Sequence, residues 1–448
     1  MIFAASLLVI FGVAALVFDG GLMLLEKRDQ QNAADAAAIA GARFLPDDQV
    51  SAEAEARDVA TINGFTDGTS DQLVTVTFPT AGQIEVAIED KTPSFFAGIW
   101  GIFEHEVGSR AVAINDDRPL GPFGMLALNP QDCGAIDIGG TGEVVSNGDI
   151  HTNSDCMGPP GGALTLRGTG EIVTAPDVAC NVVGNFSAGG ASDYNCDVAE
   201  GPPVVPIPDP FLGLDPYEPP IPTDGSGAIA YPTPPVQEGG GAMDIPTGCP
   251  GSATPASEAS PNLCRYTASY SGTTWRLYPG YYPGGLHLIG GSFYLEPGIY
   301  YVAGGGLLMN GGDASIMSVA TGGTTVGGGI LIYNGDHATE PDGDVQLTGG
   351  DSGVNLLPLG SGTYEGLVVY QDAQICLDVV LNGASSTMSV RGTIYVPCGN
   401  VSALGNGGTI ITDQIVADTF SLSGNIGSLQ VLYDDTYLPT VRLAGLIE

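Results

Sequence analysis

The stretch GGLHLIGGSFYLEPGIYYVAGGGLLMNGG, residues 284–312, contains four short apolar runs, each followed by a turn that contains glycine. Runs this short and rich in Ile, Val, Tyr and Phe favour strands over helices. Glycine and asparagine supply the positive φ angles that tight turns require. The stretch therefore predicts a succession of short strands joined by tight turns.

The same pattern recurs on both sides of this stretch. One set of runs alternates and ends in glycine or asparagine: IDIGG (136), LTLRG (164), VQLTGG (345), VVLNGA (379) and FSLSGN (420). A second set opens with glycine: GIYYVAGG (298), GILIYNG (329), GLVVYQD (366) and GTIYVPCGN (392). Because no helical pattern separates them, the repeats predict a mainly-β domain built as a right-handed parallel β-helix, with rungs of about 20–25 residues. A β-sandwich is the alternative, because the spacing is irregular.

Eight cysteines follow residue 132, and none of them forms a CxxC pair. An even number without metal-type spacing indicates disulfides formed outside the cytosol. Residues one rung apart stack about 4.8 Å apart, which suits a disulfide between adjacent rungs. The sequence does not fix which of the 105 possible connectivities forms. Pairing of neighbours along the chain, the simplest of them, gives Cys133–Cys156, Cys180–Cys196, Cys249–Cys264 and Cys376–Cys398.

Residues 201–263 interrupt the repeat with a proline-dense segment. Proline lacks the N–H that a central strand donates, so this segment is predicted to cross the surface of the β domain as an extended excursion. Together these features place a β-solenoid domain at residues 119–448.

The N-terminus has a different character, because residues 2–18 carry no charge and only Asp19 interrupts the run as far as Leu25. A helix of about 20 apolar residues spans a bilayer, so this run predicts a membrane anchor. A cleaved signal peptide is the less favoured alternative, since no basic segment precedes the run. The cysteines place the bulk of the chain on the extracytoplasmic side.

Asp19 is unusual because a carboxylate within an apolar span is costly and commonly has a function or a partner. Three interpretations remain open: a position at the outer interface, the end of the apolar helix before Gly20 and Gly21, or a contact made during assembly.

The run FDGGLMLLEKRDQQNAADAAAIAGA resembles the N-terminal signature of TadE/TadG-like Flp (Tad) pilus-assembly proteins. The elements expected after it are in the matching order: a helix in SAEAEARDVATINGF, strands in LVTVTF and QIEVAIED, a short apolar helix in TPSFFAGIWGIF and a strand in EVGSRAVAI. The resemblance implies a membrane-anchor and extended helix at 1–46 and a small α/β pilin-like unit at 47–118. It also implies insertion in the bacterial inner membrane, other pilus or secretion-system subunits as partners, and a minor-pilin-like or pseudopilin-like role. Asp19 is the candidate assembly contact by the same analogy.

The net charge of −38 lies mainly beyond residue 118, where five Lys and Arg face 32 Asp and Glu. Such a surface repels phosphates, which excludes nucleic acid as a partner. The densest acidic run, NGDHATEPDGDV, offers Asp336, Asp342 and Asp344 as weak candidates for calcium ligands. No other cofactor is expected, and the four histidines are expected at surface or turn positions.

No nucleophile elbow, phosphate loop, zinc motif or dinucleotide fingerprint occurs in the sequence. The function predicted is therefore a non-enzymatic, membrane-anchored structural protein of pilus assembly that displays a β-helix for adhesion to surfaces or glycans. The alternative is a surface-exposed β-helix protein that binds or acts on glycans.

Overall fold

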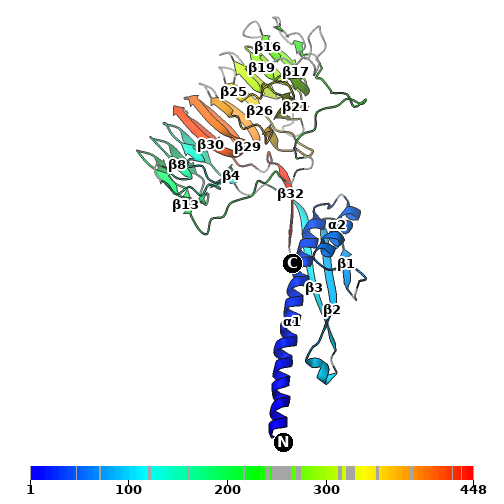
Figure 1. Ribbon diagram of the computed structural model, residues 1–448. Helices are drawn as coiled ribbons and strands as arrows, with labels where there is room; N and C mark the ends of the chain where they lie inside the picture. The colour runs from blue at the N-terminus through cyan, green and yellow to red at the C-terminus, as the bar shows by residue number, and fades with distance from the viewer. Residues whose placement is uncertain are drawn as a thin grey trace. The chain divides into compact units, whose positions relative to one another are not determined.

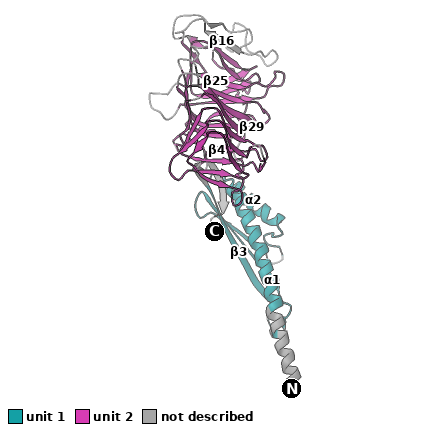
Figure 2. Ribbon diagram, turned by 90° about the vertical axis from the view of Figure 1, so that its left-hand side faces the viewer, with its two compact units in different colours: residues 1–118, 442–448 teal, residues 119–441 magenta. Residues whose placement is uncertain are grey.

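A computed structural model shows a chain that divides into two compact units, which are residues 1–118 with 442–448, and residues 119–441 (Figures 1 and 2). The structure describes residues 2–46, 48–69, 72–101, 103–119, 123–158, 161–212, 214, 217–233, 235–237, 243–244, 264–268, 274–310, 315–318, 328–349, 353–383, 387–425, 427–434 and 436–446. The last residues of the chain belong to the first unit, whereas the sequence placed them in the second. The second unit is thus an insertion within the first.

The first unit packs two helices on a four-stranded sheet of order β1-β2-β3-β32. Antiparallel pairing joins β1 to β2 and β2 to β3. Most of these elements lie where the sequence predicted them. The elements are α1 (Ile2–Ala42), α2 (Gln49–Ile62), β1 (Leu73–Thr77), β2 (Gln83–Pro93), the 3-10 helix η1 (Ala97–Trp100), β3 (Glu104–Pro119) and β32 (Thr440–Leu446).

The short apolar helix predicted in TPSFFAGIWGIF is shorter than expected, because β2 takes the first two residues of the stretch. Only η1 is helical there, at the tip of the long β2–β3 hairpin. Pairing of Pro93 with Glu104 continues the strand ladder to the start of the tip, and tertiary pairing thereby overrides the local apolar pattern.

The core of the first unit is rich in alanine because α1 lies close to α2 and to the sheet. Ala34, Ala37 and Ala38 of α1 are fully buried in this core. A methyl group on Gly41 would lie 2.6 Å from Ile84 and 2.7 Å from the Ala52 carbonyl oxygen, so glycine is required at that close approach. The polar, alanine-rich part of α1 is therefore the packing face of the helix.

The second unit is mainly β, and its strands pair in three parallel series. We name these series A, B and C, and call one strand from each a rung. Series A contains β4 (Phe123–Ala127), β7 (Asp149–Thr152), β10 (Ala179–Val182), β13 (Asp197–Glu200), β18 (Gly280–Pro283), β21 (Gly298–Ala303), β24 (Ile330–Gly335), β27 (Leu367–Gln371) and the middle parts of β29 (Thr387–Asn406) and β30 (Thr409–Asn425).

The other two series have the same construction. Series B contains β5 (Ile136–Ile138), β8 (Leu164–Leu166), β11 (Phe186–Ala188), β16 (Cys264–Ala268), β19 (Leu286–Ile289), β22 (Leu307–Asn310), β25 (Val345–Gly349), β28 (Val379–Gly383) and the last parts of β29 and β30. Series C contains β6 (Glu143–Ser146), β9 (Glu171–Thr174), β12 (Asp193–Tyr194), β17 (Thr274–Leu277), β20 (Ser292–Leu295), β23 (Ser315–Ser318), β26 (Val354–Leu356), the first parts of β29 and β30, and β31 (Ser428–Val431). Two short strands, β14 (Val236–Gln237) and β15 (Met243–Asp244), pair antiparallel with β17 and β16.

The order of the rungs in space differs from their order in the sequence. β30 pairs with β4 and β5, and β31 pairs with β6, so the last rungs of the chain lie directly against the first. The chain enters the stack at β4, runs to β13, continues through the proline-dense segment, and returns rung by rung to β31. Figure 1 shows the resulting side-by-side placement of β4 and β30.

The two sets of sequence motifs correspond to different series. The glycine-opened set forms series A, whose strands are buried on both faces: Tyr300 and Val302 lie in the inner core, while Tyr301 and Ala303 lie in a second cluster on the other face. Burial on both faces explains their nearly continuous apolar runs. The alternating runs lie mainly in series B, with one face inside and one toward solvent. The strands of the second unit pair in parallel along all three series, whereas the strands of a β-sandwich, the alternative considered from the sequence, pair antiparallel.

Candidate functional site

Asp19 lies on α1 beside the tip of the β2–β3 hairpin and is buried. Its carboxylate accepts hydrogen bonds from the backbone N–H groups of Phe95 (3.1 Å), Phe96 (3.1 Å) and Ala97 (2.7 Å). These donors precede or begin η1, so the carboxylate caps that helix in the manner of an N-cap side chain supplied from another element. Asp19 therefore fixes the hairpin tip to α1, a partner within the chain that the sequence did not reveal.

Phenylalanine rings also pack between α1 and the hairpin tip. Phe18 makes edge-to-face contacts with Phe95 and Phe96, at centroid distances of 6.2 and 5.8 Å. The Ser94 N–H donates to the Phe103 carbonyl oxygen at 2.8 Å and closes the tip. Whether Asp19 also contacts another subunit stays a prediction.

A row of tyrosines is the main feature of the second unit. Tyr281, Tyr301, Tyr333, Tyr370 and Tyr395 occupy one register position in successive strands of series A. Neighbouring ring centroids lie 5.4, 4.8, 5.4 and 4.8 Å apart. We call these five residues the tyrosine row.

The proline-dense segment covers the tyrosine row, as the prediction of a surface excursion anticipated for its described part. Phe211 is fully buried against Tyr395, and Ile207, Leu214 and Tyr217 pack against the same cluster. Residues 238–242 and 245–263 of the segment, which include Cys249, lie outside the described residues. The row is thus buried between the stack and the segment.

Hydrogen bonds connect the segment to the row. The Tyr395 hydroxyl donates to the Asp209 carboxylate at 2.6 Å, and the Tyr370 hydroxyl donates to the Tyr217 carbonyl oxygen at 2.5 Å. Burial raises the pKa of Asp209, against the opposing effect of the hydrogen bond from Tyr395. The polar contacts between the proline-dense segment and the tyrosine row therefore include the Asp209 carboxyl group, whose ionised form is disfavoured by burial.

A shallow pocket of about 490 Å³ adjoins this network. Burial also raises the pKa of Asp418, one of the residues that line it. The lining residues are Leu128, Asn153, Pro206, Ile207, Pro208, Asp209, Pro397 and Asp418.

Three disulfides link strands or corners of adjacent rungs in the second unit, and all three join neighbouring cysteines. Their Cα–Cα distances are 5.2 Å for Cys133–Cys156, 5.8 Å for Cys180–Cys196 and 4.6 Å for Cys376–Cys398. The first and third occupy the corner between series A and series B. The fourth predicted pair, Cys249–Cys264, lies outside the residues whose side chains are described.

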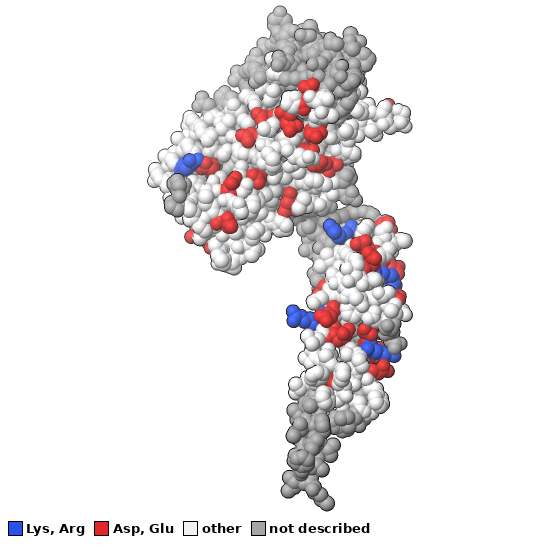
Figure 3. Space-filling model, viewed as in Figure 1, with Lys and Arg blue, Asp and Glu red and all other residues white. Residues whose placement is uncertain are grey.

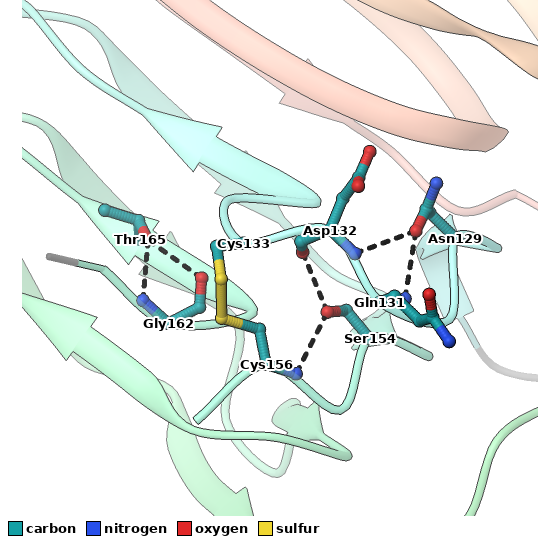
Figure 4. Close-up of a disulfide and its surroundings, with 8 residues drawn as sticks. All are labelled: Asn129, Gln131, Asp132, Cys133, Ser154, Cys156, Gly162 and Thr165. Carbon is teal, nitrogen blue, oxygen red and sulfur yellow. Dashed lines mark hydrogen bonds between the residues drawn. A yellow bond between two sulfur atoms is a disulfide. The ribbon is translucent and has the colours of Figure 1, made fainter. Parts of the chain in front are cut away.

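Figure 4 shows how the corner at Cys133–Cys156 is ordered. The Ser154 hydroxyl donates to the Asp132 carbonyl oxygen of the adjacent rung at 2.7 Å and accepts from the Cys156 N–H at 3.2 Å. The Asn129 side chain accepts from the N–H groups of Gln131 and Asp132. The disulfide thus reinforces a turn that hydrogen bonds already organise.

The calcium candidates Asp336, Asp342 and Asp344 do not gather. Across the described ranges, no group of three or more His, Cys, Asp or Glu side chains is placed to hold a metal ion. The Asp344 carboxylate instead accepts from Gln346.

The expectation of a surface or turn position is wrong for His151 and His287, which are buried in strands, whereas His337 is buried in the loop that follows β24. Burial lowers the pKa of His151.

Among the charged side chains on the visible face of the second unit, acidic ones predominate, whereas the first unit carries both signs of charge (Figure 3). Arg391 is one of the few cations of the second unit, and it pairs with the buried carboxylate of Asp413 at 2.6 Å. Burial raises the pKa of Asp413 despite this partner.

Within the described part of the chain, no helix combines the length and the apolar character that a membrane crossing requires. Side chains of residues 1–11 and 13–16, most of the predicted span, lie outside the described residues.

Comparison with known proteins bears on α1, with its long N-terminal apolar run and its alanine-rich packing face. Residues 1–43 match the family "Putative Flp pilus-assembly TadE/G-like". The TadE/G-like match covers nearly the whole of α1 and supports a role in Flp (Tad) pilus assembly, association with other assembly subunits, and a membrane or cell-surface location. None of the curated proteins and none of the solved structures matches the chain.

Proposed function

We propose that this chain is a membrane-anchored, extracytoplasmic structural subunit of the Flp (Tad) pilus, minor-pilin-like or pseudopilin-like in its first unit. The observation that carries the proposal is α1. It matches the TadE/G-like family over residues 1–43, and its C-terminal half packs on an antiparallel sheet. The uncharged run of residues 2–18 supplies the anchor in the inner membrane.

In this proposal the second unit is a right-handed parallel β-helix displayed outside the membrane. Its three parallel series and its rung-linking disulfides support that architecture. The unit binds surfaces or glycans rather than acting as an enzyme. Because the unit is strongly acidic, we expect neutral glycans to bind better than sulfated ones.

Deletion of the gene in a piliated strain tests the assembly role. We expect fewer pili by electron microscopy, with restoration by the full chain and not by a chain lacking residues 1–43. Immunogold labelling then locates the protein on the pilus or at the membrane. A normal number of pili in the deletion strain would refute the assembly role.

Glycan binding is tested separately with the detergent-solubilised full chain on an array of neutral and sulfated glycans. Release of soluble sugar from any of them would favour the alternative, a glycan-active protein.

A further inference from the structure

The hairpin tip of the first unit and the outer end of the apolar run form one band in which Asp19 is the single charged residue. On the hairpin, residues 92–103 carry no charge between Lys91 and Glu104. On α1, Asp19 is the single charge before Glu26. Hydrogen bonds between Asp19 and the tip place the two uncharged segments side by side.

Large apolar side chains are exposed across this band. Six of them have exposed fractions between 54% and 72%: Val17, Phe18, Leu24, Leu25, Phe95 and Phe103. Val17, Phe18, Leu24 and Leu25 recur at intervals of seven residues and thus share one stripe of α1. Exposed apolar residues that gather in this way mark an interaction surface, whereas scattered ones such as Ile62 need no explanation.

Several backbone N–H groups of the band have partners within the chain, as a lipid environment favours, whereas the buried Ser94 hydroxyl has none among the described residues. The Asp19 carboxylate accepts from three backbone N–H groups, so the same contact satisfies the charge and the donors. Within the tip, the Ser94 N–H donates to Phe103 and the Gly101 N–H donates to Gly98.

We propose that the hairpin tip, whose described residues are 92–101 and 103, inserts into the interface of the lipid bilayer beside α1. This inference rests on the anchoring role proposed above and extends it with a second membrane contact. Along the sequence, the exposed apolar residues of α1 follow directly on the uncharged run of residues 2–18, and the band ends at the charges Glu26, Lys91 and Glu104. Phenylalanine side chains and Trp100 of η1 are residue types suited to this depth of a bilayer.

Trp100 offers a direct test, because the chain has only one other tryptophan, Trp275, which is buried in the core of the second unit. The full chain is reconstituted into phosphatidylcholine vesicles whose acyl chains carry bromine at a shallow or a deep position. The Trp100 signal is the difference in emission between wild type and Trp100→Phe. We expect loss of this signal with shallow bromine, and a weaker loss with deep bromine.

Two variants identify the residues responsible. Phe95→Ser combined with Phe103→Ser is expected to reduce the quenching of Trp100. Ile62→Ser, an equally exposed apolar position on α2, is the matched control and is expected to leave the quenching unchanged. Equal quenching in the double variant would overturn the proposal.

Flotation of the vesicles separates this inference from the anchoring on which it rests. Protein that floats with the vesicles but keeps full Trp100 emission would overturn insertion of the tip and leave the anchor intact. Protein that does not float would overturn both. Protection of Trp100 only after association with a second copy of the chain would assign the band to a subunit contact instead, and would also overturn the proposal.

Discussion

Asp19 shows how one side chain positions a distant element. The apolar pattern around it identifies a residue that needs a partner, but not which one, because the donors lie 76 to 78 residues further along the chain. The donors are backbone N–H groups, and the side chains in the sequence do not indicate which N–H groups will bind the carboxylate. The sequence therefore identifies Asp19 as a residue that needs a partner, but it does not identify the hairpin tip as that partner.

Replacing Asp19 by alanine should release the hairpin tip. The N–H groups of Phe95, Phe96 and Ala97 lose their acceptor, so their amide hydrogen exchange should accelerate in the detergent-solubilised protein. Asp19→Asn keeps one acceptor oxygen and should give an intermediate rate. Asp29→Asn, at an exposed position of the same helix, should leave all three amides protected. Unchanged exchange in Asp19→Ala would show that the tip is held by packing alone.

Asp209 should give the second unit a pH dependence of a defined sign. Burial raises the pKa of Asp209, so the folded state favours the protonated carboxyl. Its contribution to stability is greatest below the ordinary pKa of about 3.9 and declines as pH rises through the raised folded pKa. The loss amounts to about 1.4 kcal/mol for each pH unit that separates the folded pKa from the unfolded one. The melting temperature of Asp209→Asn, relative to wild type, should therefore increase with pH across that window.

A control of opposite sign lies in the same proline-dense segment. The Ser226 hydroxyl and N–H groups donate to Asp224 and hold the pKa of that exposed carboxyl below its ordinary value. Its contribution is present above the ordinary pKa and is lost as pH falls through the lowered one. Asp224→Asn should accordingly lose stability relative to wild type as pH rises. A constant difference for Asp209→Asn at every pH would contradict the assignment.

At the scale of elements, the rungs are joined covalently as well as by strand pairing. Replacing Cys376 and Cys398 by serine removes a link between adjacent rungs that closes 22 residues of sequence. A loop of this size contributes about 3 kcal/mol through restriction of the unfolded chain. Denaturant unfolding of the double variant should show that loss. As a control, the double variant and wild type are both measured under reducing conditions. If the variant is then less stable than wild type by the same free energy of unfolding, the effect comes from the serines rather than from loss of the disulfide.

The tyrosine row should hold the proline-dense segment through its hydroxyl groups. Tyr395→Phe removes the donor to Asp209 while keeping the ring that packs on Phe211. An orphaned buried acceptor costs about 1–3 kcal/mol, so the variant should lose stability in this range. Amides of residues 207–217 should exchange faster. Tyr194→Phe, at an exposed position, should change neither quantity.

The strands of the second unit could be predicted from sequence more completely than their arrangement. Alternating runs such as IDIGG and LTLRG, and continuous ones such as GIYYVAGG, form strands as predicted. They were predictable because the local pattern of apolar residues indicates whether one or both faces of a strand are buried. Pairing of β30 with β4, in contrast, joins Ile415 to Met125. No local pattern specifies a contact between positions so distant, so the order of rungs in space was not predictable.

At the scale of the whole molecule, the second unit is inserted between β3 and β32 of the first. The chain leaves the first unit after β3, and its last strand returns to the same sheet. Within the second unit, β4 pairs with β30 and β6 pairs with β31. The two segments that connect this unit to the first therefore start from neighbouring rungs. The sheet of the first unit is therefore completed only after the whole second unit has been synthesised.

Truncation after Pro439 should expose this dependence. Loss of β32 turns β3 into an edge strand with unpaired N–H and C=O groups, each net hydrogen bond having contributed about 0.5–1.5 kcal/mol. Amides of β3 that point toward β32 should exchange faster, while those in β1, whose partner β2 remains, should keep their protection. Removing only the last two residues leaves β32 intact and should change neither strand. The exposed edge should also promote self-association of the truncated chain, measurable by sedimentation. Unchanged exchange in β3 would mean that the first unit is complete without its C-terminal strand.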